Sequence, residues 1–157
     1  MDKTEELMSL FSNLSYVYDD NMPKKQGGLN IDNYVYLNPH QSKPELTSTV
    51  SEEIGHYLTS VGDITAQDTN EKRKQERKAR DVGATLVVTA EDILKCFDSG
   101  CETTHDCADF LGVTDKTFHD AIEYYRRKYG GILTENNDIL IFNTDGTISV
   151  HKRKDGG

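Results

Sequence analysis

The sequence has no long apolar stretch, only three cysteines, and clearly fewer basic than acidic residues. No segment approaches the roughly 18 consecutive apolar residues that a membrane-spanning helix needs. The 18 Lys and Arg residues against 27 Asp and Glu residues give a formal charge of -9, which disfavours broad attraction to nucleic-acid phosphates or anionic membranes. We therefore expect neither a membrane partner nor direct nucleic-acid binding.

The cysteines and the N-terminal segment indicate the compartment. An odd number of cysteines in a chain of 157 residues fits reduced thiols rather than a disulfide framework. The first residues, MDKTEELMSLFSNLS, lack the basic start and apolar block of a secretion signal. We expect a cytoplasmic protein.

The residues that are present favour one folded domain. Charged residues make up 29% of the chain and are interspersed with apolar residues, as in globular rather than disordered proteins. The length suits a single domain, which we place at residues 1–151, followed by a frayed tail over residues 152–157.

The spacing of apolar residues predicts an α+β fold. Helical spacing and capping residues predict helices over residues 2–13, 45–59, 69–88, 90–98, 103–111 and 115–129. Alternation predicts small antiparallel strands at residues 16–18, 29–31 and 34–37, and a closing hairpin of residues 139–142 and 147–150. We expect a thin N-terminal sheet packed on the second helix, a helical C-terminal part over residues 89–130, and a C-terminal β-hairpin.

The second predicted helix carries the motif Glu52-Glu53-Ile54-Gly55-His56. Glu52 and His56 lie one turn apart and within about 40° of each other on the helix surface, so both can contact one ion. The apolar stripe of this helix is centred on another side, which leaves the Glu52/His56 edge free to face a cleft. Zincins use this arrangement: two ligands at i and i+4 hold Zn²⁺, and the Glu beside the first accepts a proton from metal-bound water. Glu53 is therefore the candidate general base.

One position differs from the zincin pattern, because a zincin has His where this chain has Glu52. A carboxylate oxygen binds Zn²⁺ at about 2.0–2.2 Å, much as an imidazole nitrogen does, so the number of ligands is kept. The added negative charge makes the ion a poorer Lewis acid and favours harder ions. We predict Zn²⁺, with Mn²⁺ as the alternative, and weaker or absent activity.

A third ligand has to come from another element, and the basic third helix offers Glu76. Glu76 shares one face with the small residues Ala79 and Gly83, which would let this helix approach the motif helix closely. The alternative from spacing alone is that Glu76 forms ordinary i,i+4 ion pairs with Lys72 and Arg80.

Two strings, TSTVSEEIGHYLTSVGDIT and KRKQERKARDVGATLVV, resemble the ImmA/IrrE family of small metallopeptidases, in particular its phage- and mobile-element-encoded members. The resemblance also includes GGLNIDNYVYLN and CADFLGVTDKTFHDAIEYYRRKYG, and it covers most of the chain. Family members carry His-Glu-x-x-His and a downstream Glu as third metal ligand. These positions correspond to Glu52, Glu53, His56 and Glu76, and three of the four match.

The resemblance implies a zincin-like minimal metallopeptidase domain. It implies a metal-dependent endopeptidase that cleaves a protein regulator, such as a phage or mobile-element transcriptional repressor. Glu52, His56 and Glu76 would bind the ion, and Glu53 would act on the attacking water. The candidate substrate contacts are His40 and Tyr57.

Two other functions remain as alternatives. A catalytically degenerate member would bind its regulator as an interaction module. Residues 103–128 resemble a DNA-binding helix-turn-helix, but Asp115 and Asp120 stand where base-contacting residues should lie. We favour a helical hairpin that packs apolar side chains into the core, namely Phe110, Leu111, Phe118, Ile122 and Tyr125.

A separate group, Cys96, Cys101, His105 and Cys107, has the spacing C-x4-C-x3-H-x-C. Zinc-site cysteines usually come as tight pairs a dozen or more residues apart, whereas this group straddles a capped helix start. We favour three ordinary thiols and a surface histidine.

Overall fold

The computed structural model describes residues 2–60 and 69–152. The helices in these ranges are α1 (Lys3–Leu10), α2 (Lys43–Thr59), α3 (Thr69–Val87), α4 (Ala90–Asp98), α5 (Thr104–Leu111) and α6 (Asp115–Lys128). The strands are β1 (Ser15–Tyr18), β2 (Gly28–Ile31), β3 (Tyr34–Leu37), β4 (Gly131–Leu133), β5 (Ile139–Phe142) and β6 (Ile148–His151). The predicted α+β class is confirmed, with every predicted helix present.

Capping explains why the short helices begin where the sequence predicts. The hydroxyls of Thr89, Thr103 and Thr114 each accept a hydrogen bond from a backbone N–H in the first turn of α4, α5 and α6, respectively. Such a bond satisfies one of the four amides that a helix start leaves without a partner.

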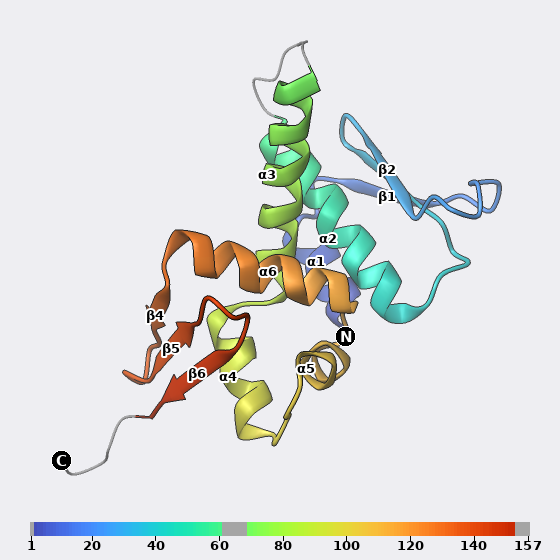
Figure 1. The fold of residues 1–157 in the computed structure, drawn as a ribbon. Coiled ribbons are helices and arrows are strands. Elements are labelled where there is room, and N and C mark those ends of the chain that lie inside the picture. Colours follow the sequence, from blue (N-terminus) through green and yellow to red (C-terminus); the bar gives the residue numbers. More distant parts are fainter. Residues whose placement is uncertain (1, 61–68, 153–157) are drawn as a thin grey trace.

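The N-terminal sheet has the order β1-β3-β2 (Figure 1). Strand β2 pairs antiparallel with β3 as predicted, but β1 pairs with β3 in parallel, so the expectation of antiparallel strands is wrong for β1. A parallel pair needs a crossover connection, and residues 19–33, which include β2, provide it. The Asn38 amide holds this connection by donating to the carbonyls of Pro23 and Gln26.

The C-terminal sheet has three strands in the order β4-β5-β6, all antiparallel. The predicted hairpin corresponds to β5 and β6, whereas β4 was not predicted. Strand β4 has only three residues and directly follows the left-handed turn at Gly130 (φ 71°). Three residues are too few to show the alternation of apolar and polar side chains from which strands are predicted.

The two sheets lie on opposite sides of the helices, and a continuous core runs between them (Figure 1). Its members come from both sheets and from helices α1 to α6. Those with no exposed surface include Val35, Leu37, Val50, Ile54, Val87, Val88, Ile93, Phe118 and Leu140. Helix α2 and helix α3 make the most extensive contact of any two elements. The predicted motif of residues 52–56 therefore lies on the helix pair with the most extensive contact.

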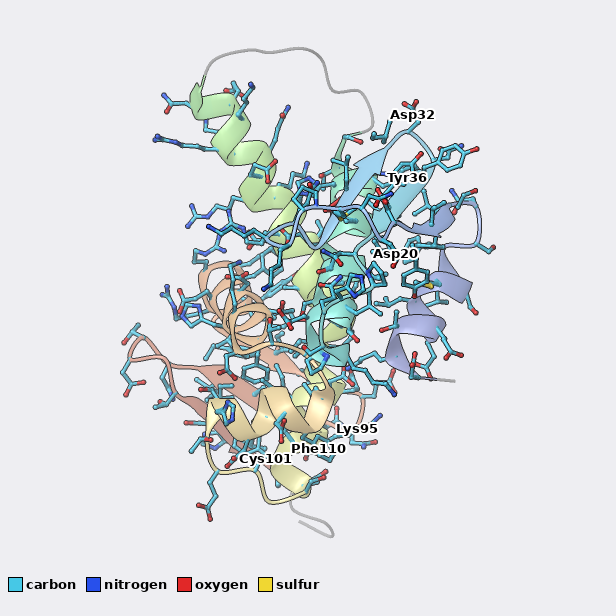
Figure 2. All side chains as sticks on the ribbon, turned by 90° about the vertical axis from the view of Figure 1, so that its right-hand side faces the viewer. Asp20, Asp32, Tyr36, Lys95, Cys101 and Phe110 are labelled. Carbon is cyan, nitrogen blue, oxygen red and sulfur yellow. The ribbon has the colours of Figure 1, made fainter. Side chains whose placement is uncertain are left out.

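The predicted helical hairpin of α5 and α6 is present. Leu111, Phe118, Ile122 and Tyr125 are buried as expected. The expectation for Phe110 is wrong: its side chain is 51% exposed, because one residue along a helix turns it about 100° away from the face of Leu111 (Figure 2).

Of the predicted tail, Lys152 is ordered through its ammonium group, which donates to Asp98, and residues 153–157 lie outside the described part. Among the helices of residues 2–60 and 69–152, none is long and apolar enough to cross a bilayer.

Candidate metal centre

Helix α2 holds the acidic pair and the histidine of the predicted site in a fixed orientation. It begins with a capping box, in which the Ser42 hydroxyl accepts from the Glu45 N–H and the Glu45 carboxylate accepts from the Ser42 N–H. Val50 and Ile54 are fully buried on its core face. The burial of that face leaves the flank that carries His56 beside helix α3.

Helix α3 approaches α2 with backbone against backbone. A Cβ added to Gly55 would overlap the carbonyl oxygen of Ala79, and one added to Gly83 would lie 2.6 Å from the carbonyl oxygen of Ser51. The close approach predicted from Ala79 and Gly83 is confirmed. It brings Glu76, about one turn before Ala79 on α3, alongside the motif of α2.

His56 and Glu76 converge. The Nε2 atom of His56 lies 3.6 Å from Oε2 of Glu76, although the residues are on different helices. Two ligands at about 2.0–2.2 Å from a tetrahedral ion lie about 3.4 Å apart. The separation of this N,O pair therefore fits two ligands of one Zn²⁺.

Glu53 lies in the same cleft, half-buried beneath strand β2. Its carboxylate accepts a hydrogen bond from the backbone N–H of Asn30. A Cβ at Gly28 would lie 2.7 Å from Cγ2 of Thr49 and 3.2 Å from Cγ of Glu53, so the glycine lets β2 pack closely on α2. The pKa of Glu53 is raised to about 7, mainly by burial and also by the charges of Glu52 and Glu76, against the opposing effects of His56 and the Asn30 N–H. A carboxyl group with this pKa suits proton transfer near neutral pH.

Glu52 lines a different cavity, of about 300 Å³, together with Arg80 and Lys116. Its donor atoms do not join those of His56 and Glu76. Among the described residues, the only three ligand side chains whose donor atoms all lie within 4.8 Å of one another are cysteines. Glu52 therefore has to rotate toward His56 before it can act as a ligand.

The cleft that holds Glu53, His56 and Glu76 has a volume of about 580 Å³. The β2–β3 turn, Asp32-Asn33, forms one side of it, and the tip at Asp32 stands out in Figure 2. The sequence predicted that the thin sheet packs on the motif helix, but not that this turn forms one side of the cleft, because no local pattern reports the position of a turn relative to distant side chains.

The two candidate substrate contacts differ in position. Tyr57 lines the cleft, and its hydroxyl accepts a hydrogen bond from the Asn13 amide at 3.0 Å. His40 is exposed, its Nε2 lies 3.5 Å from a carboxylate oxygen of Asp20, and it is not among the residues that line the cleft.

Residues 10–123 match the Peptidase_M78 family, the IrrE N-terminal-like domain. The chain belongs to this family. No curated protein matches the chain. The fold is similar to that of a Mycobacterium tuberculosis transcriptional regulator, with a TM-score of 0.60 and 11% sequence identity over 98% of this chain and 50% of that one. The chain thus spans about half the length of the regulator, and the likeness concerns the fold alone.

The family match covers α2 and α3, the two helices of the candidate site. Peptidases of this family are metal-dependent, and the imidazole and carboxylate oxygens in this cleft are suitable donors for such an ion. The IrrE-like domain therefore has two converging donors, an acid beside them and a cleft open to solvent.

Proposed function

We propose that this IrrE-like domain is a metal-dependent endopeptidase that cleaves a protein regulator, such as a transcriptional repressor of a phage or mobile element. The observation that carries the proposal is the convergence of His56 and Glu76 beside Glu53 in one cleft. The three side chains come from two helices whose backbones are in contact, which fixes the positions of the backbone segments that carry them.

His56 and Glu76 would hold the ion, with Glu52 as third ligand after a side-chain rotation. A bound Zn²⁺ would activate water and polarise the scissile carbonyl. Glu53 would accept the proton of the attacking water and then donate it to the leaving amine nitrogen. Burial raises the pKa of Glu53 to about 7 in the metal-free domain, which favours a group that both accepts and donates a proton near neutral pH.

The neighbouring strand suits a peptide substrate. Strand β2 is an edge of its sheet and lines the cleft through Leu29 and Asn30. An extended peptide can add to such an edge by main-chain hydrogen bonds, whatever its side chains. The scissile bond would then lie between β2 and the pair of His56 and Glu76.

The test takes candidate regulators from the genes beside this one and incubates each with wild type, Glu53→Gln and His56→Ala, with fragments detected by mass spectrometry. Gln keeps the size of Glu53 but takes no proton, so we expect cleavage to slow by roughly 10²–10⁴-fold while metal content is kept. His56→Ala should lose the metal. Glu91→Gln, an exposed acid on α4, is the control and should cleave normally.

Equal fragmentation by wild type and Glu53→Gln would rule out Glu53 as the base. A second candidate function is favoured by one observation, the position of Glu52 in the neighbouring cavity with Arg80. If Glu52 stays there, the ion has only two protein ligands, and the domain would bind its regulator without cleaving it. Retained binding with no fragmentation by any form would support this interaction module.

A further inference from the structure

The three cysteines of the chain lie together, at a place far from the cleft. They come from α4, from the loop after it and from α5, yet the sulfur atoms of Cys96, Cys101 and Cys107 all lie within 4.8 Å of one another. Cys96 and Cys107 are buried and Cys101 is half-buried. The sequence contains no other cysteine, so the fold brings all three thiols of the chain together.

Backbone interactions position these thiols. After α4 the chain turns at Gly100, whose φ of 87° is strained for any residue with a side chain. The Cys101 N–H then donates to the Cys96 carbonyl at 3.0 Å, which returns the chain to the end of α4. The Cys107 N–H donates to the carbonyl of the cap residue Thr103 at 3.1 Å. The cluster thus rests on a turn and a helix cap.

We propose that Cys96, Cys101 and Cys107 form a second metal site, for a thiophilic ion such as Zn²⁺. Thiolates bind Zn²⁺ at about 2.3 Å, which places two sulfurs of a tetrahedral site about 3.8 Å apart. Sulfurs that all lie within 4.8 Å of one another reach this separation through small side-chain rotations. The half-buried side of Cys101 provides the entry path and a fourth position for water.

Binding of an ion would change the protonation and the charge of the cluster. Without an ion, burial raises the pKa of the Cys96 and Cys107 thiols, which are then neutral. Binding breaks three S–H bonds, forms three S–metal bonds and releases three protons to the solvent. Three thiolates and Zn²⁺ carry one net negative charge. The Lys3 ammonium, close enough to Cys96 for their charges to interact, offsets it.

The cluster is separate from the cleft. Its residues lie in α4, α5 and the loop between them, whereas the cleft is built from β2, α2 and α3. Figure 2 shows Cys101 and Asp32 at opposite ends of the molecule. His105, the other member of the sequence motif, is exposed and has its Nδ1 2.9 Å from a carboxylate oxygen of Asp115, so the site is a three-sulfur one.

The test titrates the reduced, full-length chain with Cd²⁺, in a variant that also carries His56→Ala and Glu76→Gln to disable the cleft. We expect an ultraviolet thiolate-to-cadmium band that saturates at one ion per chain, and competition by Zn²⁺. Cys101→Ala should weaken binding by more than the roughly 10–100-fold that loss of an outer-shell group costs. Ser99→Ala, an exposed change in the same loop, is the control and should bind normally.

Thermal unfolding with and without Zn²⁺ gives a second readout, since an ion that binds only the folded state raises Tm. We expect this rise in the cleft-disabled chain and its loss on Cys101→Ala. The proposal is overturned if the folded, reduced chain gives no band, or if Cys101→Ala leaves the band unchanged. Isolation of the chain with a disulfide between two of these cysteines would also overturn it.

Discussion

At the scale of single residues, Glu52 decides how well the cleft can hold an ion. It is on the right helix, one turn before His56, yet its side chain shares a cavity with Arg80 and Lys116. The side chain has to leave this cavity and rotate toward His56 before it can bind an ion there.

We therefore predict that Glu52→His tightens zinc binding and raises peptidase activity. The imidazole adds a ligand without adding negative charge, which leaves the ion more electrophilic. Metal affinity and fragment yield are the measurements. Glu52→Gln is the matched control, because it removes the charge and supplies no strong ligand. Lower activity of a folded Glu52→His chain would mean that Glu52 is an adapted ligand.

At the scale of elements, the contact of α2 with α3 determines the position of Glu76. The helices meet at Gly55 and Gly83, where a single methyl group collides with the backbone of the partner helix. Such a collision can be relieved only by moving a helix, since a backbone carbonyl cannot rotate away as a side chain can.

Gly55→Ala should accordingly destabilise the fold by about 1–3 kcal/mol, even though Ala favours a helix by up to about 1 kcal/mol over Gly. The displaced helix should also separate His56 from Glu76 and weaken metal binding. Chemical denaturation and a metal titration measure the two effects. Lys72→Ala, on the exposed part of α3, should change neither. A stability equal to or above that of wild type would contradict the contact.

A second tie joins α3 to α6. The Arg127 guanidinium donates to both carboxylate oxygens of Asp81, at 3.3 and 3.2 Å, and Asp81 is buried. Arg127→Ala leaves that carboxylate without its cation, so we expect a loss of about 1.5–3 kcal/mol. Adding Asp81→Asn should recover part of the loss. Denaturation of both single variants and the double variant tests this, and strictly additive effects would show that the pair does not interact.

At the scale of the whole molecule, one side chain joins three helices. Lys3 on α1 donates to the carbonyl of Val87 at the end of α3 (2.9 Å) and to that of Leu111 at the end of α5 (3.2 Å). A positive charge is stabilising at the C-terminal ends of α3 and α5, because the last carbonyl groups of a helix have no hydrogen-bond partner within it. This contact holds the N-terminal helix to the centre and the C-terminal half of the fold.

Lys3→Met keeps the length of the side chain and removes the ammonium, so we expect about 1–3 kcal/mol lower stability. Unfolding followed by circular dichroism gives the measurement, with Lys95→Met on the exposed side of α4 as the control. Equal stability of the two variants would show that the Lys3 contacts carry no net free energy.

Local signals in the sequence determined the helices, their starts and the residues of the motif. Capping threonines and i,i+4 spacing act over a few residues, and the structure reproduces them at α4, α5 and α6. The small residues Ala79 and Gly83 even indicated which face of α3 meets α2. Each of these features depends on neighbours along the chain, which is why a single sequence reveals them.

Only the tertiary structure decided the features that depend on residues far apart in the chain. Strand β3 lies between β1 and β2 and runs parallel to β1. The alternation of apolar residues predicts a strand but carries no information on its direction. The side chain of Glu52 lines a cavity with Arg80 and Lys116, although its position on α2 also suits a ligand beside His56. The three thiols meet because a left-handed turn and a helix cap fold two helices against each other, which their spacing alone did not indicate.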